Sequence, residues 1–158
     1  MMLSPLKQTK PITEEKGTKK LVYSSMKGRI LVQKPHITIG YDIIDDILLV
    51  DWTGNQTKES VMDGCERMLH YLATYKVGKV LNDNTHVTSI WDDASEWVAV
   101  DWFPRMHEAG CRLFAWVYSP NLYSKLSADK SLSYGIKGVI ATTFDSKETA
   151  MAWLIAME

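Results

Sequence analysis

The stretch LNDNTHVTSIWDD, residues 81–93, holds three acids, two amides, two threonines, a serine and a histidine. Asp83, Thr85 and His86 supply an acid, a hydroxyl and a base, which are the groups that an activated nucleophile needs. Working triads take these groups from separate segments with rigid neighbours, and the sequence has no GxSxG nucleophile elbow. We therefore predict no catalytic residue. An enzyme becomes the expected function only if His86 meets a carboxylate and a hydroxyl from another segment.

The residue spacing does not indicate a metal or phosphate site either. The four histidines, His36, His70, His86 and His107, lie far apart in the sequence, with no HExxH or similar pair on a helix face. Their convergence in space stays open. The segment LNDNTHVTS has no glycine that would let backbone donors approach a phosphate. We expect no metal, no cofactor and no nucleotide site of the P-loop or Rossmann type.

The elements around this stretch favour a binding surface. KVLND, residues 79–83, is an apolar run between two helical patterns, which predicts a buried central strand. In open α/β sheets, ligands and partners meet the loops at the carboxyl ends of the strands. We hypothesise that the loop after this strand contacts a small ligand or a partner protein through Asp83, Asn84, Thr85 and His86. The structural alternative is that Asp83 and Asn84 shape a turn while Ser89 caps the next helix.

The segments before the central strand predict a hairpin and a helix. ITIGYD (residues 37–42) and ILLVDW (residues 47–52) flank a turn with Asp45 and Asp46 at its tip, which is typical of a β-hairpin. After breaker and cap candidates at residues 53–55, apolar residues recur at helical spacing, at Val61, Cys65, Met68, Leu69 and Leu72. This spacing predicts an amphipathic helix that ends at Gly78.

The segments after the central strand complete an α/β pattern. A helix is predicted from Ser89 to Gly110, with a kink or break near Phe103 because Pro104 lacks an N–H and crowds the carbonyl four residues back. Residues 111–119 and 139–144 are apolar strands, separated by a short helix opened by Pro120 and followed by a closing helix capped by Asp145. The order predicts a single-domain α/β fold: a mixed β-sheet, covered by helices, with an antiparallel opening hairpin and parallel later strands.

Charge separates the chain into two parts. Residues 1–34 hold eight Lys or Arg and two Glu, whereas residues 35–158 hold ten Lys or Arg and seventeen Asp or Glu. The lysines of the first part are scattered and lack interleaved aromatic residues, so nucleic acid is not an expected partner. We predict a basic, partly disordered N-terminal extension over residues 1–34 and the α/β domain over residues 35–158.

Targeting and redox signals are also missing from the sequence. It shows no secretory signal and no apolar run of about 20 residues, and Cys65 and Cys111 have no CxxC or metal-ligand spacing. We expect a cytoplasmic protein without a transmembrane segment, in which both cysteines are reduced core residues.

Six tryptophans are an unusual feature of so short a chain. We expect most of them in the core, each with an indole donor that needs an acceptor. The alternative is an aromatic-lined pocket for an apolar ligand. In that case we expect a gate around Pro104, formed by Trp97, Trp102 and Met106.

Six segments, taken in order, resemble the SpoIIAA-like group of small bacterial proteins, often described as STAS-like and distantly similar to lipid-carrier folds. They cover residues 37–154 and read ITIGYD, ILLVDWTG, LNDNT, WFPRMHEAG, LFAWVYS and FDSKETAMAWL. The resemblance implies an α/β domain from a group whose members mostly lack an assigned activity. STAS domains regulate partner proteins, and some are switched by phosphorylation at the start of the helix after a central strand. The corresponding candidates are Thr85 and Ser89, although this stretch lacks the Asp-Ser-Ser-Gly pattern.

We therefore predict a non-enzymatic regulatory or protein-interaction module of the STAS-like type, with a small apolar-ligand or lipid-binding protein as the alternative. The expected partner is a protein or a small apolar ligand, and a homodimer is an open alternative. An exposed apolar patch on the helix after the central strand would favour the interaction module, and an enclosed cavity would favour the ligand-binding protein.

Overall fold

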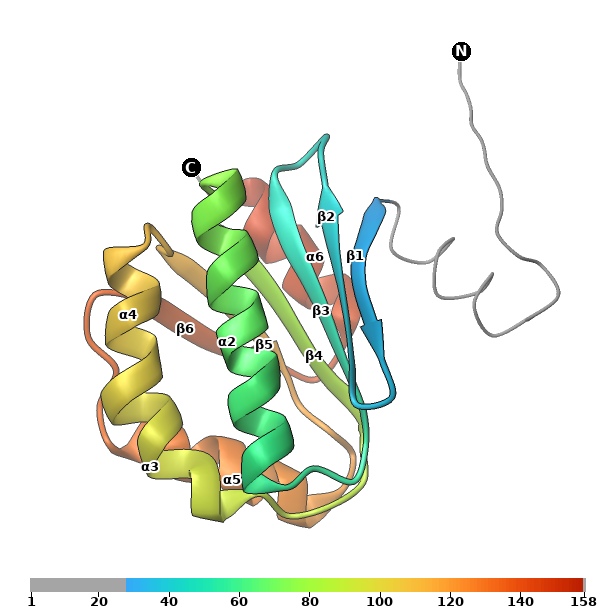
Figure 1. Ribbon diagram of the computed structural model, residues 1–158, viewed down its shortest axis with the longest axis vertical. Coiled ribbons are helices and arrows are strands. Elements are labelled where there is room, and N and C mark those ends of the chain that lie inside the picture. Colours follow the sequence, from blue (N-terminus) through green and yellow to red (C-terminus); the bar gives the residue numbers. More distant parts are fainter. Residues whose placement is uncertain (1–27, 158) are drawn as a thin grey trace, which may run out of the picture.

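Apolar and β-branched runs form six strands within residues 28–157, the part of the chain that the computed structural model describes. The strands pair in chain order into one mixed sheet (Figure 1). They are β1 (Arg29–Lys34), β2 (Ile37–Asp42), β3 (Ile47–Gly54), β4 (Lys79–Val87), β5 (Leu113–Val117) and β6 (Ile140–Phe144). β1, β2 and β3 pair antiparallel, and β3 to β6 pair parallel. The predicted mixed sheet with its antiparallel hairpin is confirmed.

The edge strand β1 lies inside the predicted N-terminal extension. Residues Arg29–Lys34 pair with β2, and Val32 is buried against the core. The sheet therefore begins before the predicted boundary at residue 35. The apolar run ILV is short, with Arg29 before it and Gln33 and Lys34 after it, so composition assigned this strand to the basic extension. The rest of the predicted extension, residues 1–27, lies outside the described residues.

Helices cover the two faces of the sheet unequally. α2 (Lys58–Tyr75), the helical segment of residues 92–108 and α5 (Leu122–Ser133) pack on one face, and α6 (Lys147–Ala156) packs on the other (Figure 1). Alternation along each strand divides the core accordingly. In β3, Leu48 and Val50 face α2, whereas Ile47 and Leu49 face α6.

The helix α2 begins and ends at positions that differ from the prediction. Its N-cap is Thr57, which forms a capping box with Ser60. Its C-cap is Lys76 in the left-handed conformation, with a backbone N–H that donates to the Leu72 carbonyl. The helix therefore ends before Gly78. The predicted cap candidates at residues 53–55 instead end β3 and start the loop to α2.

The helical segment after β4 is continuous through Pro104. It comprises a 3-10 turn (η2, Asp92–Ala94), α3 (Ser95–Trp97), a π-helical turn (η3, Val98–Trp102) and α4 (Phe103–Glu108). The Phe103 N–H donates to the Val98 carbonyl five residues back, and this wider turn accommodates a proline that has no N–H. The irregularity predicted near Phe103 is thus a π turn rather than a break. The segment starts at Asp92, so Ser89 is not its cap.

The last two helices differ from the prediction in their caps. Asn121 caps α5 by accepting from the Ser124 N–H, so the helix begins after Pro120 instead of at it, and it extends to Ser133. Ser146, not Asp145, caps α6 by accepting from the Thr149 N–H. None of the helices within the described range has the length and apolarity that a membrane span requires.

Candidate functional site

The strand β4 continues through the residues that were predicted to form a loop. Thr53 and Gly54 of β3 pair with His86 and Val87, so the strand extends to Val87. The predicted loop of residues 83–89 is therefore wrong for most of its length. Because side chains alternate along a strand, the predicted contact residues do not share one surface.

Asn82 and Asn84 lie on the face of the sheet that packs against α2. The Trp52 indole Nε1 donates to Asn82 Oδ1 at 2.9 Å, and Asn82 Nδ2 donates to Asn84 Oδ1 at 3.2 Å. All three side chains are buried. Two amides on a buried strand face need partners, and this chain of hydrogen bonds supplies most of them.

These amides line a hollow between the sheet, α2 and the helical segment of residues 92–108. We call it the tryptophan hollow. It is partly open to the surface. The centre of a water-sized sphere can occupy about 30 Å³ within it, and this corresponds to space for about two water molecules. Its lining residues are Trp52, Gln56, Val61, Cys65, Asn82, Asn84, Val87, Trp91, Val98, Trp102, Phe114 and Trp116.

Aromatic rings in contact with one another form the walls of the hollow. Trp91 and Trp116 stack with ring centroids 6.1 Å apart, and Phe114 meets Trp116 edge to face at 5.5 Å. Trp102 meets Phe114 in the same manner at 5.9 Å. The π turn supplies both Val98 and Trp102, so the irregular part of the helix faces the hollow.

Hydrogen bonds hold three of the four indoles that line the hollow. Trp52 donates to Asn82, Trp91 Nε1 donates to Ser124 Oγ at 3.3 Å, and Trp102 Nε1 donates to the Cys65 carbonyl at 2.8 Å. The Trp116 Nε1 is buried and has no acceptor among residues 28–157. Buried indole donors usually have an acceptor, so this one is a polar group that the fold leaves unpaired.

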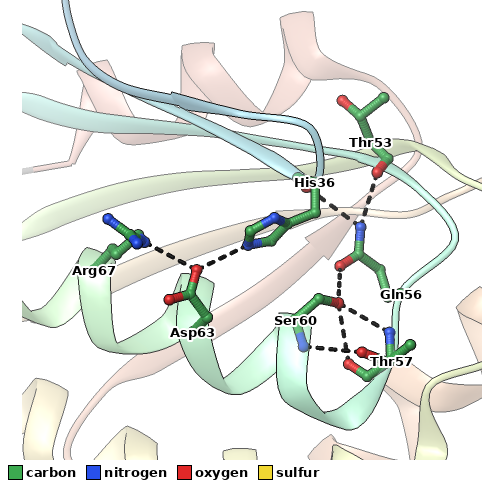
Figure 2. A network of polar contacts seen from close by, with 7 residues as sticks. All are labelled: His36, Thr53, Gln56, Thr57, Ser60, Asp63 and Arg67. Carbon is green, nitrogen blue, oxygen red and sulfur yellow. Dashed lines mark hydrogen bonds and ion pairs between the residues drawn. The ribbon is translucent and has the colours of Figure 1, made fainter.

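Gln56 is fixed beside the hollow by a polar network at the start of α2 (Figure 2). Its Nε2 donates to the carbonyls of His36 (3.3 Å) and Thr53 (3.0 Å), and its Oε1 accepts from Ser60 Oγ at 2.7 Å. Its backbone N–H donates to Ser89 Oγ at 2.8 Å. The side-chain polar atoms of Gln56 are therefore engaged within the protein.

A second part of this network attaches α2 to the connection between β1 and β2 (Figure 2). Asp63 Oδ2 accepts from Arg67 Nε at 2.9 Å and lies 3.0 Å from His36 Nε2. The hydrogen bond from Arg67 is the largest cause that lowers the pKa of Asp63, and His36 adds to it. These contacts hold the β1–β2 connection, whose His36 carbonyl accepts from Gln56, against α2.

The thiol in the wall of the hollow is not an activated nucleophile. Burial raises the pKa of Cys65 well above its usual value, and it raises the pKa of Cys111 to about 12. Both cysteines are buried and unpaired, as the sequence predicted for reduced core residues.

Asp83 and Thr85 belong to the opposite face, which α6 covers. Asp83 Oδ1 accepts from the Thr85 backbone N–H at 2.9 Å and from Thr85 Oγ1 at 2.5 Å. On the neighbouring strand, Asp51 lies beside Asp83 in register. Burial and the charge of Asp83 raise the pKa of Asp51, while His86 and Lys147 act in the opposite direction.

His86 meets only part of the condition for an enzyme. Its Nδ1 is 3.8 Å from Asp51 Oδ1, which is an ion-pair distance and too long for a hydrogen bond. The carboxylate thus comes from another strand. The hydroxyl beside it in the sequence, Thr85 Oγ1, donates to Asp83 rather than to His86. No group of three or more His, Cys, Asp or Glu within the described residues is arranged to hold a metal ion.

Of the three predicted gate residues, only Trp102 lines the hollow. Met106 is fully buried in the core, and Trp97 lies half-buried beneath the Arg105 guanidinium, 5.8 Å from its ring centroid. Of the candidate phosphoacceptors, Thr85 is bound to Asp83 and Ser89 is bound to Gln56. Both hydroxyls are therefore occupied in structural hydrogen bonds.

Sequence reasoning missed five residues of the hollow that matter most for its chemistry. They are Gln56, Asn82, Trp91, Phe114 and Trp116. The available signal was alternation: Asn82 and Asn84 follow Val80 at every second position of an apolar strand, which predicts two amides on a buried face.

Comparisons with known proteins identify no family for this chain. No protein-family model and no curated relative matches this chain. Among solved structures, an uncharacterized protein from the DUF3478 family with a SpoIIAA-like fold, from Shewanella loihica PV-4, is similar to it, with a TM-score of 0.49 and 18% sequence identity. The similarity covers 78% of this chain and 98% of that one. The fold named for that structure is the one that the sequence motifs resemble.

Proposed function

We propose that this protein binds a small, largely apolar molecule in the tryptophan hollow. The observation that supports the proposal is unfilled space among large aromatic side chains. Protein interiors are packed as densely as organic crystals, and a void in a core costs stability. Concave sites with aromatic walls and a few fixed polar groups are typical of small-molecule binding.

The size of the hollow limits the ligand. Room for about two waters admits a compact molecule, or a small end group that enters through the open side. An acyl chain needs a longer tunnel. The geometry therefore supports a small ligand better than a lipid.

Xenon is a direct probe of this proposal because it enters apolar cavities without hydrogen bonding. We expect xenon under pressure to shift the NMR signals of the lining indoles, Trp91, Trp102 and Trp116, more than that of Trp153, which lies outside the hollow. Val98→Ile should reduce this response because it adds a methylene to the wall. Val139→Ile is the matched control, since Val139 is buried in the same core but does not line the hollow. Equal shifts for all the indoles would contradict the proposal.

A protein-interaction role is the second candidate, and α5 is the observation that favours it. This helix buries Ser124, Ser127, Ala128 and Ser131 and exposes large apolar residues in its first half. Leu122, Tyr123 and Leu126 are 62%, 61% and 51% exposed. Residues three and four apart lie on one side of a helix, and apolar patches of this kind mark interaction sites.

Self-association is the form of this role that can be tested with the protein alone. Light scattering over a range of concentrations should show a dimer for the wild type and a monomer for the double variant Leu122→Ser, Leu126→Ser. A wild type that stays monomeric at every concentration would contradict self-association through α5.

A further inference from the structure

The hydrogen bonds in the tryptophan hollow run in a single direction. An indole nitrogen can only donate, so the contact from Trp52 requires that Asn82 presents its oxygen to the ring. The amide nitrogen of Asn82 then donates to Asn84, so Asn84 must accept with its side-chain oxygen. This order settles the orientation of both amides from the chemistry of one donor. The Asn84 Nδ2 group is therefore the last donor in this series of hydrogen bonds.

The polar groups of the hollow that lack a hydrogen-bond partner are therefore two N–H donors. Within the described residues, neither Asn84 Nδ2 nor Trp116 Nε1 has an acceptor. The side-chain oxygens of Asn82 and Asn84 each already accept a hydrogen bond, and Gln56 is engaged at both ends. Trp116 Nε1 is buried, whereas Asn84 Nδ2 is not one of the buried unpaired atoms and stays accessible to water. A ligand that pairs with the Trp116 N–H must contribute an acceptor, because a buried N–H without a partner is costly.

The lining also selects the charge of that acceptor. All twelve lining residues are uncharged: five aromatic rings, three valines, a cysteine and three amides. A carboxylate buried here would lose its hydration without gaining a cation, whereas a carbonyl oxygen loses much less. The site therefore favours a neutral acceptor over an anionic one.

We infer that the ligand of the tryptophan hollow is a small neutral molecule with a carbonyl oxygen, a ketone or aldehyde, held by hydrogen bonds from Trp116 Nε1 and Asn84 Nδ2. The inference rests on the proposed function and specifies its ligand class. The aromatic rings contact the apolar substituents of the ligand, and the two donors fix its oxygen.

Three probes of similar shape separate the contribution of the carbonyl oxygen to binding from the contributions of apolar contact and of charge. Acetone carries the carbonyl oxygen, isobutene replaces that oxygen with a methylene group, and acetate replaces a methyl group with a charged oxygen. NMR titration of the tryptophan-labelled wild type measures the binding of each probe through the indole N–H signals. We expect acetone to bind at least about tenfold more tightly than isobutene, because one net hydrogen bond, that of the buried Trp116 N–H, already supplies this factor. Acetone should also bind more tightly than acetate. The Trp116 N–H signal should show the largest downfield shift.

A pair of variants identifies the donor. Trp116→Phe removes the buried unpaired N–H and should lower the acetone-to-isobutene ratio to the smaller preference that Asn84 Nδ2 alone supplies. Trp91→Phe is the matched comparison, because it also shortens a ring in the wall but removes an N–H that is already paired with Ser124. Its ratio should stay near that of the wild type. The wild-type titrations alone decide the inference if a variant does not fold.

The outcomes separate this inference from the proposed function. Isobutene and xenon binding without a preference for acetone would overturn the inference and leave the proposed function standing. If acetate binds more tightly than acetone, the inference that the ligand carries a neutral acceptor is overturned. If no probe competes with an ordered water at the two donors, and xenon does not bind, then the inference and the proposed function both fail.

Discussion

Asp51 and Asp83 place two carboxyl groups side by side on the α6 face of the sheet. Burial and the charge of Asp83 raise the pKa of Asp51, so the folded state binds this proton more tightly than the unfolded chain does. A raised carboxyl pKa stabilises the fold at low pH, and this contribution is lost as pH rises above the ordinary value of about 4. Ionisation of Asp51 therefore opposes folding at neutral pH.

The first residue-scale prediction concerns Asp51→Asn, which removes the charge and keeps the shape. We expect a higher free energy of unfolding at neutral pH and a weaker loss of stability as pH rises from about 4 to about 7, in urea denaturation at several pH values. Glu96→Gln is the control, because Glu96 is exposed on the outer side of its helix. A lower stability at neutral pH would show that His86 and Lys147 outweigh burial and Asp83.

The second residue-scale prediction separates the two roles of Asp83. Asp83→Ala leaves the Thr85 N–H and hydroxyl without their acceptor, whereas Asp83→Asn retains an oxygen at the same place. We expect the alanine variant to be less stable than the asparagine variant by about 1–3 kcal/mol in chemical denaturation. Equal stabilities would show that this carboxylate does not hold the end of β4.

At the element scale, the approach of α2 to the sheet depends on a glycine. A Cβ at Gly64 would overlap the Trp52 indole and come within 2.9 Å of the Ile37 side chain. The close approach lets Trp52 reach Asn82 and form one wall of the tryptophan hollow. Packing therefore requires glycine at this position, although glycine has a poor intrinsic helix propensity.

Gly64→Ala should destabilise the protein although alanine favours helix. Helix propensity alone predicts a gain of roughly 1 kcal/mol, but overpacking typically costs about 1–3 kcal/mol, and here a rigid ring has to move. Ala73→Gly, at an exposed site of the same helix, measures the intrinsic difference in this protein. Urea denaturation of the two variants gives the comparison. A stabilised Gly64→Ala variant would show that the Trp52 ring shifts at little cost.

At the scale of the whole molecule, β1 completes the sheet at an edge that composition alone assigned to the extension. Its pairing with β2 buries Val32 and covers the backbone groups of β2. We propose that the folded domain begins near Gly28 rather than at residue 35. An uncovered β2 would present unpaired N–H and C=O groups, which promote association between chains.

Two truncations test where the domain begins. Removal of residues 1–27 should leave the free energy of unfolding nearly unchanged. Removal of residues 1–34 should lower it by about 1–3 kcal/mol from the lost burial of Val32 alone, and more from the lost pairing. Thermal and urea denaturation of both truncated chains provide the measurement. A large loss already in the shorter truncation would show that residues 1–27 contribute to the fold.

The sequence by itself determined the order of the elements from β2 onward, the antiparallel hairpin with Asp45 and Asp46 at its turn, and the parallel strands that follow. These features depend on local periodicity and turn residues, which are properties of short segments. Caps were less certain because neighbouring polar residues compete for one role, as Asp145 and Ser146 do before α6.

Only the tertiary structure decided the candidate site. The end of β4 depends on pairing with Thr53 and Gly54, which lie more than 30 residues earlier in the chain. The tryptophan hollow depends on rings from β3, β5 and the helical segment of residues 92–108 that pack without filling the space between them. A void is set by the relative placement of distant side chains, and no periodicity within one segment encodes it.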